Sequence, residues 1–431
     1  MRNPLKQSLF RSTLIYTITD GISKAISFLL LPLISYYIIP SQMGIVANFD
    51  VLQNIISLIA GQAIINSIPY FYYERSHKDI ATLVSSMLLI VLITEVILFL
   101  ILLCINPLLQ KHLHLTIGIQ ILTVVASTCY LLTCTNLVLL RLEEKSITFA
   151  KLQLLQTIIY ISLIVILVII KNMEAIGRIY ATTLSLTTIG IIHLISLVKR
   201  KYLTFKKDIY TIKYLLKFGI PLLPHSLSFW VKGGLDKVLL TSFCGLAANG
   251  IYSMAMSFGA IYTIFNNAFN NAYVPYLQKK LAKLERAESS MQKEKKKMVN
   301  LTYKITSIFI ILYFFSVFVC WVAINYLLSD KYKPSFEYIP WIMLSLTIMA
   351  FYNLVIQFIY NKKKTLGLGI ITFIGSIIQV ALTYLFIKYI GASGIKYSLV
   401  ICSLIMMLIV WYYSNKVYPL PWFSFKKKFN N

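Results

Sequence analysis

The segment FGIPLLPHSLSFWVKGGLDKVLL, residues 218–240, is long and apolar enough to cross a bilayer, yet it contains two prolines, a glycine pair and three charged residues. An ionised side chain at the centre of a membrane helix costs about 2.5 to 3.5 kcal/mol. Lys232, Asp236 and Lys237 must therefore face protein or water rather than lipid. The segment predicts a membrane helix that borders a polar space.

The whole chain has the composition of a membrane protein. Of its 431 residues, 58% are hydrophobic, and the mean hydropathy is +0.75. A run of about 20 apolar residues spans the hydrocarbon core. Twelve such runs can be delimited, at 11–38, 43–72, 80–104, 116–140, 149–170, 175–198, 216–243, 248–274, 301–328, 335–361, 365–389 and 393–415. We therefore predict an all-α polytopic membrane protein with twelve transmembrane helices in two six-helix bundles.

The distribution of basic residues predicts the orientation. The formal net charge is +26, and most of the lysines and arginines lie in the two tails and in the loops on their side. The opposite side holds only Lys111, Lys171, Arg178, Lys331, Lys333, Lys388 and Lys396. Cytoplasmic loops carry the excess of positive charge, so both termini are predicted to be cytoplasmic, with the first span as an uncleaved anchor. Because the basic residues are spread over separate loops, we expect no nucleic-acid partner; the charge suits anionic lipid headgroups.

The chain divides near its middle. We predict an N-terminal six-helix bundle at 1–198, a basic cytoplasmic linker with an amphipathic helix at 199–217, a C-terminal six-helix bundle at 218–415 and a basic cytoplasmic tail at 416–431. The segments YIIPSQMGIVANF and SFCGLAANGIYSMAM follow the first helix of each half, and they align Gly44 with Gly250. Two repeats of six spans have the same orientation and are related by an axis along the membrane normal.

The first two helices carry polar faces. Thr13, Thr17, Asp20, Lys24 and Ser27 recur at helical spacing, so Asp20 and Lys24 are expected to form an ion pair. In the second helix Asp50, Asn54, Ser57 and Gly61 share one face. Such groups are hard to satisfy against lipid. They form either the wall of a cavity or, for Asp20 and Lys24, a buried pair that ties two helices together.

In residues 218–240, one helical face combines His225, Ser228, Lys232 and Asp236. Lys237 is turned about 100° away, toward the face of Trp230 and Gly233. Pro221 and Pro224 are predicted to kink the helix, and Gly233 and Gly234 to permit a hinge. The segment is either a bending cation-bearing wall or the site of a purely structural Lys232–Asp236 pair.

Two further sets of polar residues lie within apolar spans. Glu95 is the only carboxylate in the third span, where it either binds a coupling proton or is a neutral acid bonded to a neighbouring helix. Asn267 and Asn270 belong to a cluster of four asparagines in the eighth span. These amides either bind sugar hydroxyls or cap the end of the helix.

The run FGIPLLPHSLSFW with LDKVLL, followed by GLAANGIYSMAMSFGAIYTIFNNAFNNAYVPYL, resembles the seventh and eighth helices of bacterial polysaccharide-repeat flippases (Wzx-like proteins). The opening segment KAISFLLLPLISYYIIPSQMGIVANFDVLQNII is similar to their first helix pair. These flippases belong to the multidrug/oligosaccharidyl-lipid/polysaccharide exporter superfamily, so the resemblance implies a MATE-like arrangement of the bundles. The family usually has Asp-Arg where this chain has Asp236-Lys237, which keeps the charge but loses a bidentate donor.

The resemblance implies a carrier in the bacterial inner membrane that moves undecaprenyl-diphosphate-linked oligosaccharides outward by alternating access, for O-antigen or capsule synthesis. Lys24, Lys232 and Lys237 are candidates for the diphosphate, as point charges, and Asn267 and Asn270 for the glycan. Asp20, Asp50, Glu95 and Asp236 are charge partners or ion-coupling groups. The family further implies antiport of H⁺ or Na⁺ without another cofactor. It also implies a polysaccharide polymerase and a chain-length regulator as partners.

Two other functions are compatible with a polytopic membrane protein. A multidrug exporter for cations is expected to have a negatively charged cavity, whereas Lys24, Lys232 and Lys237 against Asp20 and Asp236 sum to +1 (three minus two), or to zero with Asp50. A polysaccharide polymerase or ligase needs catalytic groups on the outer face, where every predicted loop is short. The sequence contains no metal-binding cluster, nucleophile motif or glycine-rich phosphate loop, so we expect no enzyme.

Overall fold

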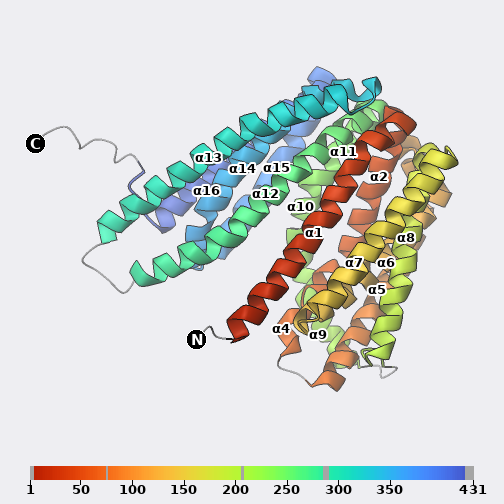
Figure 1. The fold of residues 1–431 in the computed structure, drawn as a ribbon, viewed down its shortest axis with the longest axis horizontal. Helices are drawn as coiled ribbons and strands as arrows, with labels where there is room; N and C mark the ends of the chain where they lie inside the picture. Colours follow the sequence, from red (N-terminus) through yellow and green to blue (C-terminus); the bar gives the residue numbers. More distant parts are fainter. Residues whose placement is uncertain (1–3, 74–75, 205–207, 285–290, 423–431) are drawn as a thin grey trace, which may run out of the picture. The chain divides into compact units, whose positions relative to one another are not determined.

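The computed structural model describes residues 4–73, 76–204, 208–284 and 291–422, and every regular element within them is helical (Figure 1). The predicted all-α fold is confirmed. The chain divides into two compact units, Met1–Ser253 and Met254–Asn431, which are described one at a time. The division falls inside one long helix, whereas the sequence places the bundle boundary at residues 199–217; the predicted bundle limits stay predictions.

The first unit is built around one central helix. Its elements are α1 (Pro4–Tyr37), α2 (Pro40–Ser57), η1 (Leu58–Gln62), α3 (Ala63–Ile65), α4 (Ile68–Tyr72), α5 (His77–Leu113), α6 (Ile117–Leu142), α7 (Ser146–Ile164), η2 (Val165–Ile170), α8 (Glu174–Lys199), α9 (Ile209–Gly219), η3 (Ile220–Leu222), α10 (Leu223–Trp230), η4 (Val231–Leu235), α11 (Asp236–Cys244) and the start of α12 (Leu246–Leu284). Helix α6 packs against α8, α2 and α5, whereas α1 lies along α7 (Figure 1). The core therefore surrounds α6.

The second unit begins within α12 and continues with four more long helices. Its elements are α13 (Met291–Tyr326), η6 (Asp330–Glu337), α14 (Ile339–Asn361), α15 (Thr365–Ile390), η7 (Gly391–Ser393) and α16 (Gly394–Val417). Helix α16 packs against both α14 and α15. Close approach is possible because Gly375 of α15 faces Met406 of α16, where an added Cβ would lie 1.9 Å from the Met406 sulfur.

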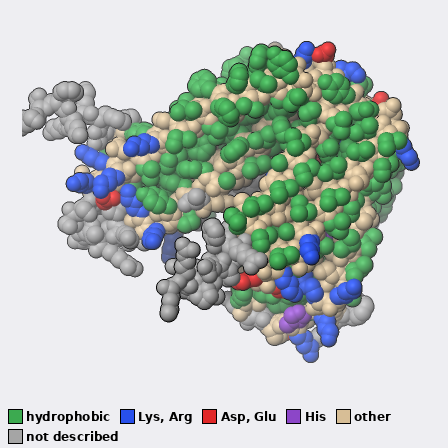
Figure 2. Space-filling view, in the orientation of Figure 1, with side chains coloured by type: hydrophobic (Ala, Val, Ile, Leu, Met, Phe, Trp, Pro, Cys, Tyr) green, Lys and Arg blue, Asp and Glu red, His purple; other side chains and the backbone are tan. Residues whose placement is uncertain are grey.

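The surface of both units is apolar along the helix flanks, as Figure 2 shows, with basic side chains gathered near helix ends. Leu29, Phe314 and Leu366 are 70%, 66% and 80% exposed. Large apolar groups exposed to this extent over many helices require lipid rather than water as the solvent. The protein is therefore a multi-pass membrane protein.

Nine helices of the described residues are long and apolar enough to cross a membrane. One of these, Leu366–Val417, contains both α15 and α16, which Gly391 (φ 75°) separates. The predicted spans at 216–243 and 248–274 lie on α9 to α11 and on α12, which are not among the nine. The number twelve and the cytoplasmic position of the termini stay predictions.

The aligned glycines of the sequence repeat meet in the first unit. A Cβ added to Gly44 of α2 would lie 2.2 Å from the Leu246 carbonyl oxygen, and one added to Gly250 of α12 would lie 1.8 Å from the Pro40 carbonyl oxygen. Only glycine allows two helix backbones to come this close. The alignment thus identified two positions that form one helix crossing.

Candidate functional site

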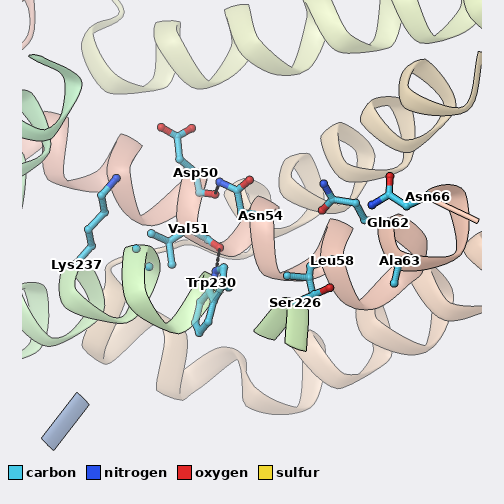
Figure 3. Close-up of a pocket in the computed structure, with 12 residues that line it drawn as sticks. Asp50, Val51, Asn54, Leu58, Gln62, Ala63, Asn66, Ser226, Trp230 and Lys237 are labelled. Carbon is cyan, nitrogen blue, oxygen red and sulfur yellow. Dashed lines mark hydrogen bonds between the residues drawn. The ribbon is translucent and has the colours of Figure 1, made fainter. Parts of the chain in front are cut away.

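A polar cavity of about 470 Å³ lies within the first unit, between the α2–η1–α3 segment and the α10–η4–α11 segment (Figure 3). Its lining residues are Asp50, Val51, Asn54, Leu58, Gln62, Ala63, Asn66, Ser226, Trp230, Gly233, Gly234 and Lys237. One carboxylate, one ammonium group and three carboxamides thus face a common space. The prediction that the second and seventh spans border a polar cavity agrees with this geometry.

Both helical segments change their winding at the cavity. Leu58–Gln62 and Val231–Leu235 are π-helical turns, which replace i→i+4 hydrogen bonds by i→i+5 bonds. Each turn contains a glycine at a close contact: a Cβ added to Gly61 would lie 2.4 Å from Val91 on α5, and a Cβ added to Gly234 would lie 2.9 Å from the Trp230 ring. Widened turns expose backbone and side chains that a regular helix would cover, and both widened turns contribute lining residues.

One face of the seventh span borders the cavity. The lining residues Trp230, Gly233 and Lys237 form the face toward which the sequence turned Lys237, not the face of Ser228 and Asp236. Ser228 and Asp236 are buried, with 6% and 2% of their surface exposed. The Lys232 and His225 side chains lie outside the described residues.

Asp50 and Lys237 are electrostatic partners across the cavity. Both also interact with Arg178 of α8, and Lys237 interacts in addition with Asp236. Figure 3 shows the Asp50 carboxylate and the Lys237 ammonium group on opposing segments, directed to the same end of the cavity. Two cations and two carboxylates therefore share this part of the first unit, so its formal charge balances.

Two hydrogen bonds of the lining fix its geometry. The indole Nε1 of Trp230 donates to the Val51 carbonyl oxygen at 3.2 Å, and the Asn54 side chain donates to the Asp50 carbonyl oxygen at 2.8 Å. Because the Trp230 bond joins α10 to α2, it holds the two walls together (Figure 3). The Asn54 amide oxygen and the Gln62 and Asn66 side chains remain oriented along the wall formed by α2, η1 and the residues that follow.

A buried amide network supports α2 and α11 next to the cavity. Asn249 donates to Asn48 Oδ1 and to Thr241 Oγ1, each at 2.9 Å, and Asn48 donates to the Leu113 carbonyl oxygen at 2.9 Å. Asn48 and Asn249 have no exposed surface. Buried amides with satisfied hydrogen bonds fix helix positions, so this network makes the cavity walls rigid at one end.

The predicted hinge positions coincide with irregular winding. Pro221 lies in the 3₁₀ turn η3, and Pro224 lies at the beginning of α10, where proline removes a donor that the helix does not use. Gly233 and Gly234 lie in the π turn η4. The segment is therefore interrupted where the sequence predicted, while motion about these positions stays a prediction.

In the structure, Asp20 has a partner other than the predicted Lys24. No salt bridge of the described residues joins the two; instead Gln153 of α7 donates to Asp20 Oδ1 at 2.6 Å, and Thr157 of α7 donates to Ser23 at 3.1 Å. Lys24 is exposed. The polar face of α1 thus includes a contact to α7, and neither Asp20 nor Lys24 lines the described cavity.

Glu95 of α5 is buried away from the cavity lining, and Ser127 of α6 donates to its Oε1 at 2.6 Å. Asn267 and Asn270 belong to the second unit, where Asn267 is exposed and Asn270 donates to the Asn266 carbonyl oxygen at 2.9 Å. The substrate and coupling roles of these residues stay predictions.

Sequence reasoning missed two participants. Arg178 was counted only among the charges of the outer side, but it lies near the beginning of α8, where its Nη1 is 2.9 Å from the Met43 sulfur of α2. Trp230 was named only as a marker of the face toward which Lys237 is turned. Helical spacing within one segment gives no information on which helix packs against it, so Arg178 carried no signal. Among the described residues, no group of three or more His, Cys, Asp or Glu could hold a metal ion.

The protein is therefore a multi-pass helical membrane protein with an apolar exterior, and its first unit contains a charged cavity between interrupted helices. Residues 9–280, more than half of the chain, match the model of the polysaccharide biosynthesis protein family. The protein belongs to this family. Lsg locus protein 1 of Haemophilus influenzae is 23% identical over 437 residues, which cover 95% of this chain and 98% of that protein.

Solved structures of transporters have the same fold. An inward-facing multidrug resistance MATE family transporter of the MOP superfamily matches with a TM-score of 0.72 and 16% identity, over 91% of this chain and 94% of its own. The lipid II flippase MurJ, in an inward closed conformation, matches with a TM-score of 0.70 and 15% identity, over 93% and 87%. The resemblance to the polysaccharide flippases of this superfamily, with a MATE-like fold, is thereby confirmed, and the protein is a multi-pass protein of the bacterial inner membrane.

Proposed function

We propose that this protein translocates lipid-diphosphate-linked oligosaccharide repeat units from the cytoplasmic to the outer leaflet, for assembly of a surface polysaccharide such as O-antigen or capsule. Such a substrate combines a diphosphate, a polar glycan and a long apolar tail. The family supports the polysaccharide pathway, and the fold supports a transporter. The observation that carries the proposal is the cavity that combines Lys237 with the carboxamides of Asn54, Gln62 and Asn66.

Each part of this substrate has a chemical counterpart in the protein. Lys237 supplies a compact positive charge for a phosphate oxygen, and a charge-assisted hydrogen bond contributes about 1.5 to 3 kcal/mol. The carboxamides both donate and accept, as sugar hydroxyls require. Lys24, Lys232, Asn267 and Asn270 are additional candidates for the same substrate. The apolar helix flanks leave the lipid tail in the bilayer while the polar part is bound.

Charge balance in the cavity suggests how binding changes the site. Asp50 is the carboxylate of the described cavity lining that interacts with Lys237. A diphosphate that binds Lys237 competes with Asp50, and the carboxylate then gains from a proton or a sodium ion. We therefore propose that Asp50, with Asp20 and Asp236 as further candidates, links substrate binding to H⁺ or Na⁺ antiport. In this scheme a polymerase and a chain-length regulator use the translocated unit.

Translocation in proteoliposomes tests the proposal. A lipid-diphosphate oligosaccharide should reach the opposite leaflet with wild-type protein. Lys237→Ala should lower the rate about tenfold or more, because 1.4 kcal/mol corresponds to a factor of ten. Lys237→Arg should retain most of the rate because it keeps the charge. Lys213→Ala, which removes an exposed cation of α9, is the matched control and should equal wild type.

Two outcomes would contradict the proposal. If Lys237→Ala, checked for folded yield, transports the lipid at the wild-type rate, Lys237 does not bind the diphosphate. If wild type leaves the lipid in place but expels cationic dyes, the protein is a multidrug exporter. We disfavour that alternative because Asp50 is the only carboxylate in the described cavity lining and is offset there by Lys237.

A further inference from the structure

The first unit contains a buried carboxyl group outside the cavity lining, on helix α5, which packs against η1. Glu95 of α5 is 3% exposed, although its neighbours Leu92, Ile93, Val96 and Ile97 are each at least 50% exposed on the apolar surface. Helix α5 thus turns its only mid-span acid inward and its aliphatic residues outward. The acid is placed at membrane depth with no access of its own to bulk water.

Glu95 has one hydroxyl partner and, among the described residues, no salt bridge. Ser127 Oγ is 2.6 Å from Glu95 Oε1, and Oε2 is buried without a hydrogen-bond partner in the described structure. No salt bridge involving Glu95 is found among the described residues. A buried carboxylate that lacks a compensating charge is strongly disfavoured, whereas a neutral carboxyl needs only one acceptor for its proton. The surroundings of Glu95 therefore favour the protonated form.

The titratable groups on the helices packed against α5 do not change this conclusion. They are Cys129, Tyr130, Cys134 and Arg141 on α6, Asp50 on α2, Tyr210, Lys213, Tyr214 and Lys217 on α9, and Asp236, Lys237 and Cys244 on α11. Arg141 lies over the Phe149 ring, and both lysines of α9 are exposed. Of all these groups, Cys129 interacts electrostatically with Glu95, and a neutral thiol supplies no positive charge. The cations of the cavity interact with Asp50 and Asp236 instead.

The hydroxyl partners form a chain that ends beside the cavity. Ser57 Oγ is 3.0 Å from Ser127 Oγ and 2.8 Å from the Gln53 carbonyl oxygen. With Glu95 ionised, Ser127 donates to Glu95 Oε1. With Glu95 protonated, a chain in which each group donates once runs from Glu95 to Ser127, from Ser127 to Ser57 and from Ser57 to the Gln53 carbonyl oxygen, which can only accept. That arrangement requires the carboxyl proton on Glu95 and satisfies every hydroxyl.

The chain is joined to the cavity by the π turn. Ser57 directly precedes Leu58, the first residue of η1 and a cavity-lining residue. The other side of η1 lies against α5, because a Cβ on Gly61 would be 2.4 Å from Val91, one helical turn before Glu95. Ser57 is therefore adjacent in the chain to the cavity lining without being part of it.

We propose that Glu95, Ser127 and Ser57 form a proton-binding site that exchanges its proton with the cavity through the π turn η1. For release, the Glu95 proton moves to Ser127 Oγ, the Ser127 hydroxyl proton moves to Ser57 Oγ, and the Ser57 hydroxyl proton moves to cavity water. Each serine gains one proton and loses one, Glu95 becomes a carboxylate, and water becomes hydronium. Only the use of this proton in transport depends on the function proposed above.

Infrared spectroscopy of the purified full-length protein in lipid nanodiscs tests the site without a transport assay. At neutral pH the wild type should show the carbonyl absorption of a protonated carboxyl that is absent in Glu95→Gln and unchanged in Glu144→Gln, an exposed control. Identical carboxyl absorption in wild type and Glu95→Gln over the whole pH range would overturn the assignment. A band that Na⁺ removes at constant pH would show a sodium site instead.

Hydrogen–deuterium exchange tests the path. After transfer into D₂O, the Glu95 band should shift about tenfold more slowly in Ser57→Ala and in Ser127→Ala than in wild type, because each variant removes one proton carrier. Thr135→Ala, which removes a buried hydroxyl of α6 outside the chain, is the matched control. Equal rates in all four proteins, with folded yield checked by gel filtration, would show that the proton does not pass through the two serines.

Discussion

At the scale of single residues, the ionised groups with the best-defined partners lie at the helix ends. Arg200 donates to Glu143 Oε1 at 2.5 Å and to Asn136 Oδ1 at 2.6 Å, and Tyr202 also donates to Glu143. Burial alone would raise the pKa of Glu143, but the hydrogen bonds from Arg200, Lys145 and Tyr202 outweigh it and hold the pKa below its usual value. This cluster ties the end of α6 to the segment that follows α8.

The lowered pKa of Glu143 predicts a pH-dependent contribution to stability. A group whose pKa is lower in the folded protein stabilises the fold above its ordinary pKa, here 4.5, and loses that contribution as the pH falls further. Glu143→Gln should therefore lower thermal stability at pH 7 by about 2 kcal/mol, since Arg200 loses its charged acceptor. The difference from wild type should shrink below pH 4.5.

Thermal unfolding in detergent at several pH values measures this effect. Glu144→Gln is the matched control, because Glu144 is an exposed neighbour and should leave the transition unchanged. A destabilisation by Glu143→Gln that is the same at pH 7 and at pH 3.5 would contradict an electrostatic origin.

At the scale of elements, the crossing of α2 and α12 depends on two glycines. Gly44→Ala would place a methyl group against the backbone of Leu246, which cannot move aside as a flexible side chain could. Overpacking of a rigid contact costs about 1 to 3 kcal/mol. We expect Gly44→Ala to lower the thermal transition measurably. Gly118→Ala on α6, where no atom lies within 4 Å, should be neutral or stabilising. Equal effects of the two variants would mean that the crossing tolerates separation.

The periodicity of each helical segment also explains how far the sequence could predict the site. Helical spacing identified the α2 face with Asp50 and Asn54, because α2 is regular up to Ser57. In the seventh span it placed Lys237 on the face of Trp230 and Gly233, which lines the described cavity, and it did not single out that face over the one with Ser228 and Asp236. It also paired Asp20 with Lys24, whereas the better partner, Gln153, belongs to another helix. Partners across helices are set by tertiary packing, which one segment does not encode.

At the scale of the whole molecule, hydropathy was sufficient for the class of protein because lipid imposes one strong constraint on every exposed side chain. It was also sufficient for most spans, including α5 and α13, which the sequence delimits at 80–104 and 301–328. Hydropathy alone gave no account of the interruptions η1 and η4; for η4 the signal came from Gly233 and Gly234, and η1 carried no such paired signal. The cavity depends on those interruptions, so the fold was more predictable than the site.

The predicted orientation across the membrane determines which loops can be labelled from outside the cell. If basic loops are cytoplasmic, then Lys111 and Lys331 face outward, while Lys199 and Lys363 face inward; all four side chains are exposed. Single cysteines at these positions, in a protein whose own cysteines have been replaced, should differ in labelling by a membrane-impermeant maleimide added to intact cells. Lys111→Cys and Lys331→Cys should react, and Lys199→Cys and Lys363→Cys should react only after permeabilisation. A reversed pattern would place the termini outside. Equal labelling of positions 331 and 363 would mean that α14 does not cross the membrane.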